Sequence, residues 1–191
     1  MPFGTGVLIS GTFTPGNRVL GNLVGTDVSG TRALGNGING VEVRGPNTVV
    51  GGLTAGERNV ISGNGIAGVS LWDRDALVQG NLIGTDVTGT QALGNLIGVD
   101  LFGGINTMIG GTTTEARNLI SGNRAVGINT FSGGNFINLQ IQGNYIGTDV
   151  TGTRALGNVT GRSPWVIRTE SSSAARPGVT SSAARRSGPA T

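Results

Sequence analysis

The chain of 191 residues contains no cysteine, no histidine and no lysine, so arginine supplies all 13 of its basic side chains. The absence of cysteine excludes disulfides and thiolate metal sites. Without histidine and lysine, most of the general-base and nucleophile arrangements that enzymes use cannot be built. Aromatic residues make up only 4% of the chain. No apolar run approaches the ~18 residues of a membrane-spanning helix, so no membrane span is expected.

The net charge of +3 is unevenly distributed along the chain. Residues 1–161 contain eight arginines and nine acidic residues, a net charge of −1, whereas residues 162–191 contain five arginines and one glutamate, a net charge of +4. The second segment is rich in Ser, Ala, Arg, Gly and Pro, which predicts a disordered tail. Its arginines are scattered and are not interleaved with aromatic residues, so we do not expect a nucleic-acid partner.

Glycine is abundant, with 37 residues, and the chain repeats itself. The phrase GNLVGTDVSGTRALGN begins at Gly21, and close copies begin at Gly80 and Gly143. A second phrase, NTVVGGLTAGERNVISGN at 47–64, returns as NTMIGGTTTEARNLISGN at 106–123. A catalytic motif is normally needed once, whereas a phrase that recurs at near-regular spacing indicates a repeat architecture.

The repeating unit is about thirty residues long, and two unequal kinds of unit alternate. Each unit holds three short apolar pieces with a period of two, rich in β-branched residues and ended by Gly or Asn, which predicts strands and turns. Such short strands bury a core only by stacking on their equivalents in the next unit. We therefore predict that residues 1–161 form an all-β parallel β-helix of about five coils with three short strands per coil. One inward column should contain Val7, Val41, Val69, Val99 and Ile128.

The GTD phrase is predicted to be an excursion between coils in which Asp27, Asp86 and Asp149 cap local turns. Equivalent loops two coils apart would lie roughly 9.6 Å from one another. One calcium ion, with ligands at ~2.4 Å, cannot bridge that gap, so no metal site is predicted. The asparagines at matching corners are expected to join amide ladders; they are Asn64 with Asn123, and Asn22 with Asn81 and Asn144.

Phrases such as GNYIGTDVTGTRALGN and ARNLISGN resemble the Gly/Asn-rich parallel β-helix repeats of large secreted or surface-attached bacterial proteins. The resemblance covers about residues 4–160 and implies right-handed coiling and an extracellular or cell-surface location. It does not imply one activity, because the wider superfamily includes pectate lyases, polygalacturonases, phage tailspikes and adhesins.

Two surface features are candidates for function. In WDRD at 72–75, Asp73 and Asp75 would share one face of an extended strand, where they resemble the acidic calcium ligands of a pectate-lyase-like site. The alternative is that they are solvent-facing turn residues after the strand. Trp72, Phe102 and Phe131 follow equivalent strands on successive coils, so the three rings should form one column. That column is a platform for sugar rings or a partner if the strand continues. If the chain turns there, the rings instead cover the core or stack on one another as an aromatic ladder.

The sequence favours a non-catalytic structural or interaction module that acts as a stalk, a spacer or an adhesive surface, with no catalytic residue and no cofactor. The alternative is a carbohydrate-active β-helix, either a sugar-binding module or a fragment of a polysaccharide lyase or hydrolase. A third interpretation is a truncated reading frame. Expected partners are neighbouring coils of a longer parent chain, another copy stacked head to tail, or a polysaccharide.

Overall fold

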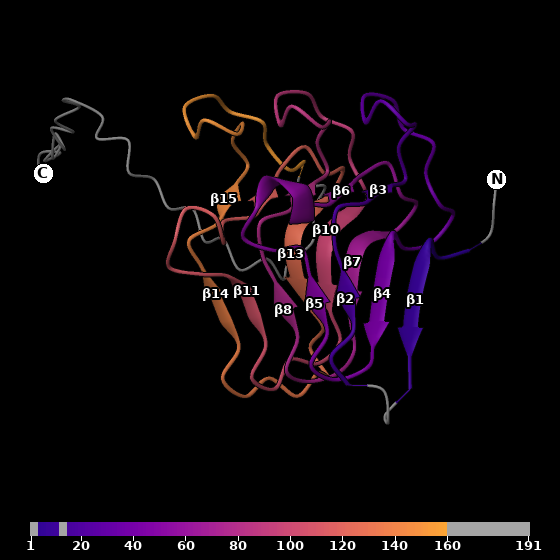
Figure 1. Cartoon of the computed structure of the whole chain (residues 1–191), viewed down its shortest axis with the longest axis vertical. Coiled ribbons are helices and arrows are strands. Elements are labelled where there is room, and N and C mark those ends of the chain that lie inside the picture. Colours follow the sequence, from indigo (N-terminus) through magenta and orange to yellow (C-terminus); the bar gives the residue numbers. More distant parts are fainter. Residues whose placement is uncertain (1–3, 12–14, 160–191) are drawn as a thin grey trace, which may run out of the picture.

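The structure is a computed structural model of the chain, and it describes residues 4–11 and 15–159. The predicted tail, residues 162–191, lies outside the described residues. Within them, the chain winds through three sheets of five parallel strands each (Figure 1). Every coil contributes one strand to each sheet. The predicted parallel β-helix, with about five coils and three short strands per coil, is therefore confirmed.

The strands are named by their order in the chain, and each sheet contains every third strand. Sheet A consists of β1 (Val7–Ser10), β4 (Val41–Arg44), β7 (Ala67–Leu71), β10 (Ile97–Leu101) and β13 (Val126–Thr130). Sheet B consists of β2 (Arg18–Val19), β5 (Val49–Val50), β8 (Leu77–Val78), β11 (Met108–Gly110) and β14 (Gln140–Gln142). Sheet C consists of β3 (Leu23–Val24), β6 (Val60–Ile61), β9 (Leu82–Ile83), β12 (Leu119–Ile120) and β15 (Tyr145–Ile146). A single 3-10 turn, Ala55–Glu57, interrupts the described part of the chain.

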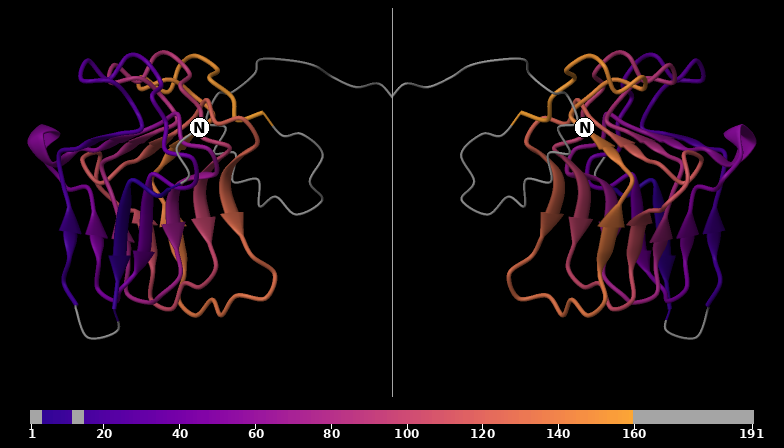
Figure 2. Two further views of the ribbon diagram at one scale, coloured as in Figure 1. Left: turned by 90° about the vertical axis from the view of Figure 1, so that its right-hand side faces the viewer. Right: turned by 90° about the vertical axis from the view of Figure 1, so that its left-hand side faces the viewer.

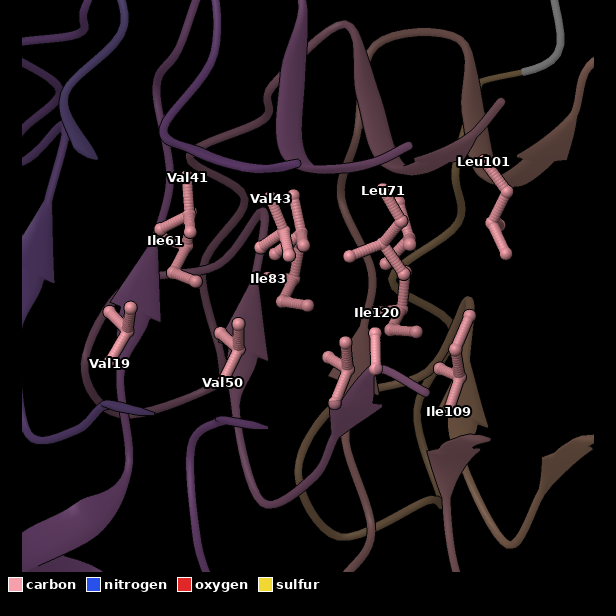
Figure 3. Packing of buried hydrophobic residues seen from close by; sticks show 14 of the residues in the cluster. Val19, Val41, Val43, Val50, Ile61, Leu71, Ile83, Leu101, Ile109 and Ile120 are labelled. Carbon is pink, nitrogen blue, oxygen red and sulfur yellow. The ribbon is translucent and has the colours of Figure 1, made fainter. Parts of the chain in front are cut away.

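The interior is filled by the inward-pointing side chains of the three sheets, which alternate with outward-pointing ones along each strand. The register of sheet A places the predicted column of Val7, Val41, Val69, Val99 and Ile128 in one row. Sheets B and C add one row each, and the side chains from the three walls pack against one another (Figure 3). The central members of these rows are fully buried. The repeated apolar positions of the sequence therefore form one continuous core.

Two asparagine ladders run along the corners on either side of sheet C. In the first, the side-chain amide of each asparagine donates to the Oδ1 of the next at 2.9–3.1 Å, through Asn22, Asn59, Asn81, Asn118 and Asn144. The second repeats this pattern through Asn36, Asn64, Asn95, Asn123 and Asn158. The predicted ladders are therefore present, and each has a rung on every coil. The expectation from the sequence included only alternate rungs, because neighbouring coils place the asparagine in different phrases.

The GTD phrase forms a hairpin loop that leaves sheet C on the first, third and fifth coils, here called the long coils. An antiparallel bridge closes each loop, for example between Thr85 and Ala92. The three loops project from the same side of the helix (Figures 1 and 2). The second and fourth coils, 37–64 and 96–123, have the ISGN corner in place of a loop and are here called short coils. The alternation of two unequal units in the sequence is thus an alternation of corners.

One buried hydroxyl provides a stability prediction with an internal control. Thr48 and Thr107 are fully buried at equivalent positions, and the Thr48 hydroxyl donates to the Gly45 carbonyl at 2.8 Å. The Thr107 Oγ1 has no hydrogen-bond partner among the described residues. Thr107→Val should therefore raise the free energy of unfolding by about 1 kcal/mol, whereas Thr48→Val should lower it by about 1 kcal/mol. Urea denaturation of the two variants measures this difference, and a destabilised Thr107→Val protein would contradict the prediction.

Candidate functional site

The outer face of sheet A carries two rows of non-glycine side chains that follow the coils. The strand register aligns Glu42, Ser70, Asp100 and Asn129 in a polar row. Two residues further along each chain segment lies a second row, composed of Arg44, Trp72, Phe102 and Phe131. Backbone hydrogen bonds continue the ladder to this second row, since the Phe102 N–H donates to the Leu71 carbonyl at 2.8 Å. The parallel sheet thus brings together three aromatic residues that lie about 30 residues apart in sequence.

The three rings stack on one another. The ring centroids of Trp72 and Phe102 are 3.9 Å apart with planes inclined by 7°, and those of Phe102 and Phe131 are 5.5 Å apart at 32°. The Arg44 guanidinium lies 4.9 Å from the Trp72 ring centroid. Of the two arrangements expected from the sequence, the structure adopts the aromatic ladder. Phe102 lies between the other two rings, while Trp72 and Phe131 at the ends of the ladder are 43% and 52% exposed.

The polar row beside the rings is buried although it points away from the core. Glu42, Ser70 and Asp100 are each less than 7% exposed. The Trp72 Nε1 donates to the Ser70 hydroxyl at 2.9 Å, so the indole folds back along its strand. Arg44 forms an ion pair with Glu42 at 2.6 Å, and Asn129 donates to Asp100 at 2.8 Å. We did not expect this row, although the alternation in VEVR, VSLW and VDLF signals a polar side chain between two inward ones.

Asp100 is the member of this row whose charge is least compensated. Burial raises the pKa of its carboxyl group, and the hydrogen bond from Asn129 acts in the opposite direction. A carboxyl group with a raised pKa in the folded state destabilises the fold when it is charged. That penalty is present at neutral pH and disappears as the pH falls through the folded pKa toward the ordinary value of 3.8.

Asp100→Asn is therefore expected to raise the melting temperature at neutral pH, because the neutral amide still accepts the hydrogen bond from Asn129. This advantage over the wild type should vanish as the pH falls to about 3, where the wild-type carboxyl group is protonated. Melting curves of both proteins between these pH values measure the effect. The loop aspartates titrate in both proteins and cancel in the difference. An Asp100→Asn protein less stable than the wild type at neutral pH would refute the prediction.

Asp73 and Asp75 belong to no cluster of acidic side chains among the described residues. Strand β7 ends at Leu71, and Asp75 has a φ of 58°, which places it in a left-handed turn. Asn106 and Asn138 have similar φ angles at equivalent turns, and the side chains of Asp75, Asn106 and Asn138 are linked by hydrogen bonds. The pair is thus part of a turn, as in the alternative given above. Among the described residues, no group of three His, Cys, Asp or Glu side chains could hold a metal ion.

The loop aspartates are engaged by their own loops. Asp86 Oδ1 accepts hydrogen bonds from the backbone N–H groups of Thr90 and Gln91 at 3.0 Å, and Oδ2 accepts one from the Thr88 hydroxyl at 2.6 Å. In the first and third loops, a hydrogen bond from a Ser or Thr hydroxyl is the main cause that lowers the pKa of Asp27 and Asp149. The predicted turn-capping role is consistent with these contacts, which need no bound ion.

Comparison of the chain with protein-family models, with curated proteins and with solved structures gave no match. In the part of the chain that the structure describes, no helix is long and apolar enough to cross a membrane. The fold and the arrangement of polar groups define the class, which is a parallel β-helix repeat protein with asparagine-ladder corners.

Proposed function

We propose that this chain is a non-catalytic structural and interaction module of an extracellular repeat protein, which acts as a rigid stalk, a spacer or an adhesive surface. The observation that carries the proposal is the pair of asparagine ladders. Each ladder links all five coils through side-chain hydrogen bonds, in addition to the backbone bonds of the sheets. Five coils at ~4.8 Å each give a rod segment roughly 24 Å long.

The inventory of polar groups supports a non-catalytic role. The sequence contains no histidine, lysine or cysteine. Glu42 is paired with Arg44, Asp86 caps its loop, and Glu57 accepts hydrogen bonds from the backbone N–H groups of Leu53 and Thr54. These carboxylates serve local structure. The extracellular location rests on the resemblance of the repeated phrases to those of secreted and surface-attached bacterial proteins.

A carbohydrate-active role is the alternative, and the outer face of sheet A is where it would operate. Sugar rings bind aromatic side chains by stacking on exposed ring faces. Here Phe102 lies between Trp72 and Phe131, and the Arg44 guanidinium lies over Trp72. Phe102 is thus enclosed by two rings and Trp72 by Phe102 and Arg44, so at most the outer face of Phe131 is left for stacking with a sugar. We therefore rank the structural and interaction role first.

A screen for polysaccharide binding and cleavage, with and without calcium, tests the proposal. Purified protein is expected to release no product from pectin, alginate or related polymers, because the sequence has no histidine or lysine and the described residues contain no acidic cluster to cleave them. Asp73→Ala and Asp75→Ala proteins should behave like the wild type in the same assay. Calcium-dependent turnover that either substitution abolishes would replace the proposed function with the carbohydrate-active alternative.

A further inference from the structure

The loops explain why long and short coils must alternate. Each loop is a hairpin, with its outgoing and returning arms joined by an antiparallel bridge. The Val87 N–H donates to the Gly30 carbonyl of the preceding loop at 3.0 Å, and Val150 binds Gly89 in the same way. Two hydrogen-bonded chains are roughly 9.6 Å thick, which equals the height of two coils. A loop on every coil would not fit, so a short coil must lie between two long ones.

Within this chain, the third and fifth coils, which are long, bind the preceding short coil through the same set of contacts. The Gly63 N–H donates to the Leu93 carbonyl at 2.6 Å, and Gly122 donates to Leu156 at 2.9 Å. The preceding ladder asparagine donates to the following one, as Asn64 does to Asn95 at 2.9 Å. The same interface therefore occurs twice, at the third and at the fifth coil.

The first coil is also a long coil, and it presents the same surface without a preceding coil among the described residues. Leu34 is 68% exposed, whereas its equivalent Leu93 is half-buried. Leu23 is 41% exposed, whereas its equivalent Leu82 is 3% exposed. Among the described residues, no donor reaches the Oδ1 of Asn22 or that of Asn36, while the matching Oδ1 atoms of later rungs accept hydrogen bonds.

We propose that this surface, here called the N-terminal face, binds a parallel coil of the short kind. The face consists of Asn22, Leu23, Leu34, Asn36 and the edge of β1 that pairs with no strand of the described residues. The occupant would donate a ladder amide to each of the two open Oδ1 atoms and a corner glycine N–H to the Leu34 carbonyl. It would also cover Leu23 and Leu34 with its own apolar side chains. Residues 96–123 of this chain are one example of a short coil. This proposal rests on the proposed function and adds the partner of one surface to it.

The loops also argue against a second copy stacked directly end to end. The fifth coil is a long coil, and its loop extends from Gly147 to Leu156. In the first loop, Ala33 of the returning arm lies against the corner Gly63 of the next, short coil. By the same geometry, the returning arm of the last loop occupies the level of the next coil. The first coil of another copy would bring its own loop to that level, and the two loops would collide.

The test titrates the full-length protein with two synthetic peptides and follows amide hydrogen exchange in residues 20–36. Peptide 96–123 is the short coil, and peptide 65–95 is a long coil of similar length that serves as the matched control. The short-coil peptide is expected to slow exchange several-fold around Leu23 and Leu34, as in strand addition at an open sheet edge. The long-coil peptide should have no such effect.

Because a free peptide loses much entropy on ordering, a fused version provides the second measurement. Residues 96–123 joined ahead of Gly4 should raise the melting temperature, and residues 65–95 joined there should not. Leu34→Glu should abolish both the protection and the gain in melting temperature. Val28→Glu is the control, because Val28 is 96% exposed on the same loop and lies outside the surface that a loopless coil covers.

The proposal is overturned if the two peptides protect equally, if neither the short-coil peptide nor its fusion has an effect, or if the protein alone forms end-to-end oligomers that protect the same residues. These outcomes are independent of the polysaccharide assay. Cleavage of a polysaccharide would contradict the proposed non-catalytic role and would not affect the proposed binding of a short coil.

Discussion

Asn81→Leu is expected to lower the free energy of unfolding by about 3–5 kcal/mol, because it removes a fully buried rung of an asparagine ladder. The Asn81 amide donates to Asn118 Oδ1 and to the Val50 carbonyl, and its Oδ1 accepts from the amide of Asn59. Leucine fills a similar volume and can make none of these bonds. The buried Asn59 backbone N–H and one hydrogen of the Asn59 amide would be left without a partner. Asn118 Oδ1 and the Val50 carbonyl would each lose one of their hydrogen bonds.

Asn22→Leu provides the matched control, because Asn22 is the exposed first rung of the same ladder. It donates to Asn59 Oδ1 and to the Leu20 carbonyl, and water can replace the bonds that are lost at its exposed site. We expect a loss of about 1 kcal/mol or less. Urea denaturation followed by circular dichroism compares the two variants. Equal losses would mean that burial of the ladder does not determine its contribution.

Gly84→Ala is expected to have an effect of comparable size, more than about 3 kcal/mol, for a steric reason. Gly84 has a φ of 92°, a conformation that disfavours any side chain by roughly 1–2 kcal/mol. A Cβ atom at this position would also overlap with the Ser121 carbonyl oxygen and the Asn123 side chain of the next coil. Both neighbours are held in place by the sheet and by the second ladder, so neither can move away at low cost.

Gly16→Ala separates these two contributions. Gly16 has a φ of 81°, and no atom of the described residues lies within 4 Å of the Cβ that alanine would add. This variant should therefore lose only the backbone term, about 1–2 kcal/mol. Thermal unfolding of the two variants measures the difference. A Gly84→Ala protein that melts close to Gly16→Ala would show that adjacent coils can separate locally to admit a methyl group.

The fold could be predicted from the sequence because equivalent positions of successive coils carry the same kind of side chain. A side chain that points inward on one coil lies above its equivalent on the next, so Val41, Val69 and Val99 recur with the period of the coil. The same reasoning predicted that Asn22, Asn81 and Asn144 belong to one ladder. It did not find Asn59 and Asn118 between them, because the short coils place the same rung in a different phrase.

Only the tertiary structure determined how the side chains on the surface are arranged. The sequence does not state where strand β7 ends, and its end at Leu71 is what makes Asp75 a turn residue. Whether Trp72 and Phe102 offer their faces or stack on one another depends on side-chain rotamers and on contacts between coils, which no local pattern encodes. The thickness of the hairpin loops likewise follows from hydrogen bonds between Val87 and Gly30, which lie 57 residues apart in sequence. The repeated apolar positions thus determined the core, while contacts between coils determined which surfaces remain free to bind.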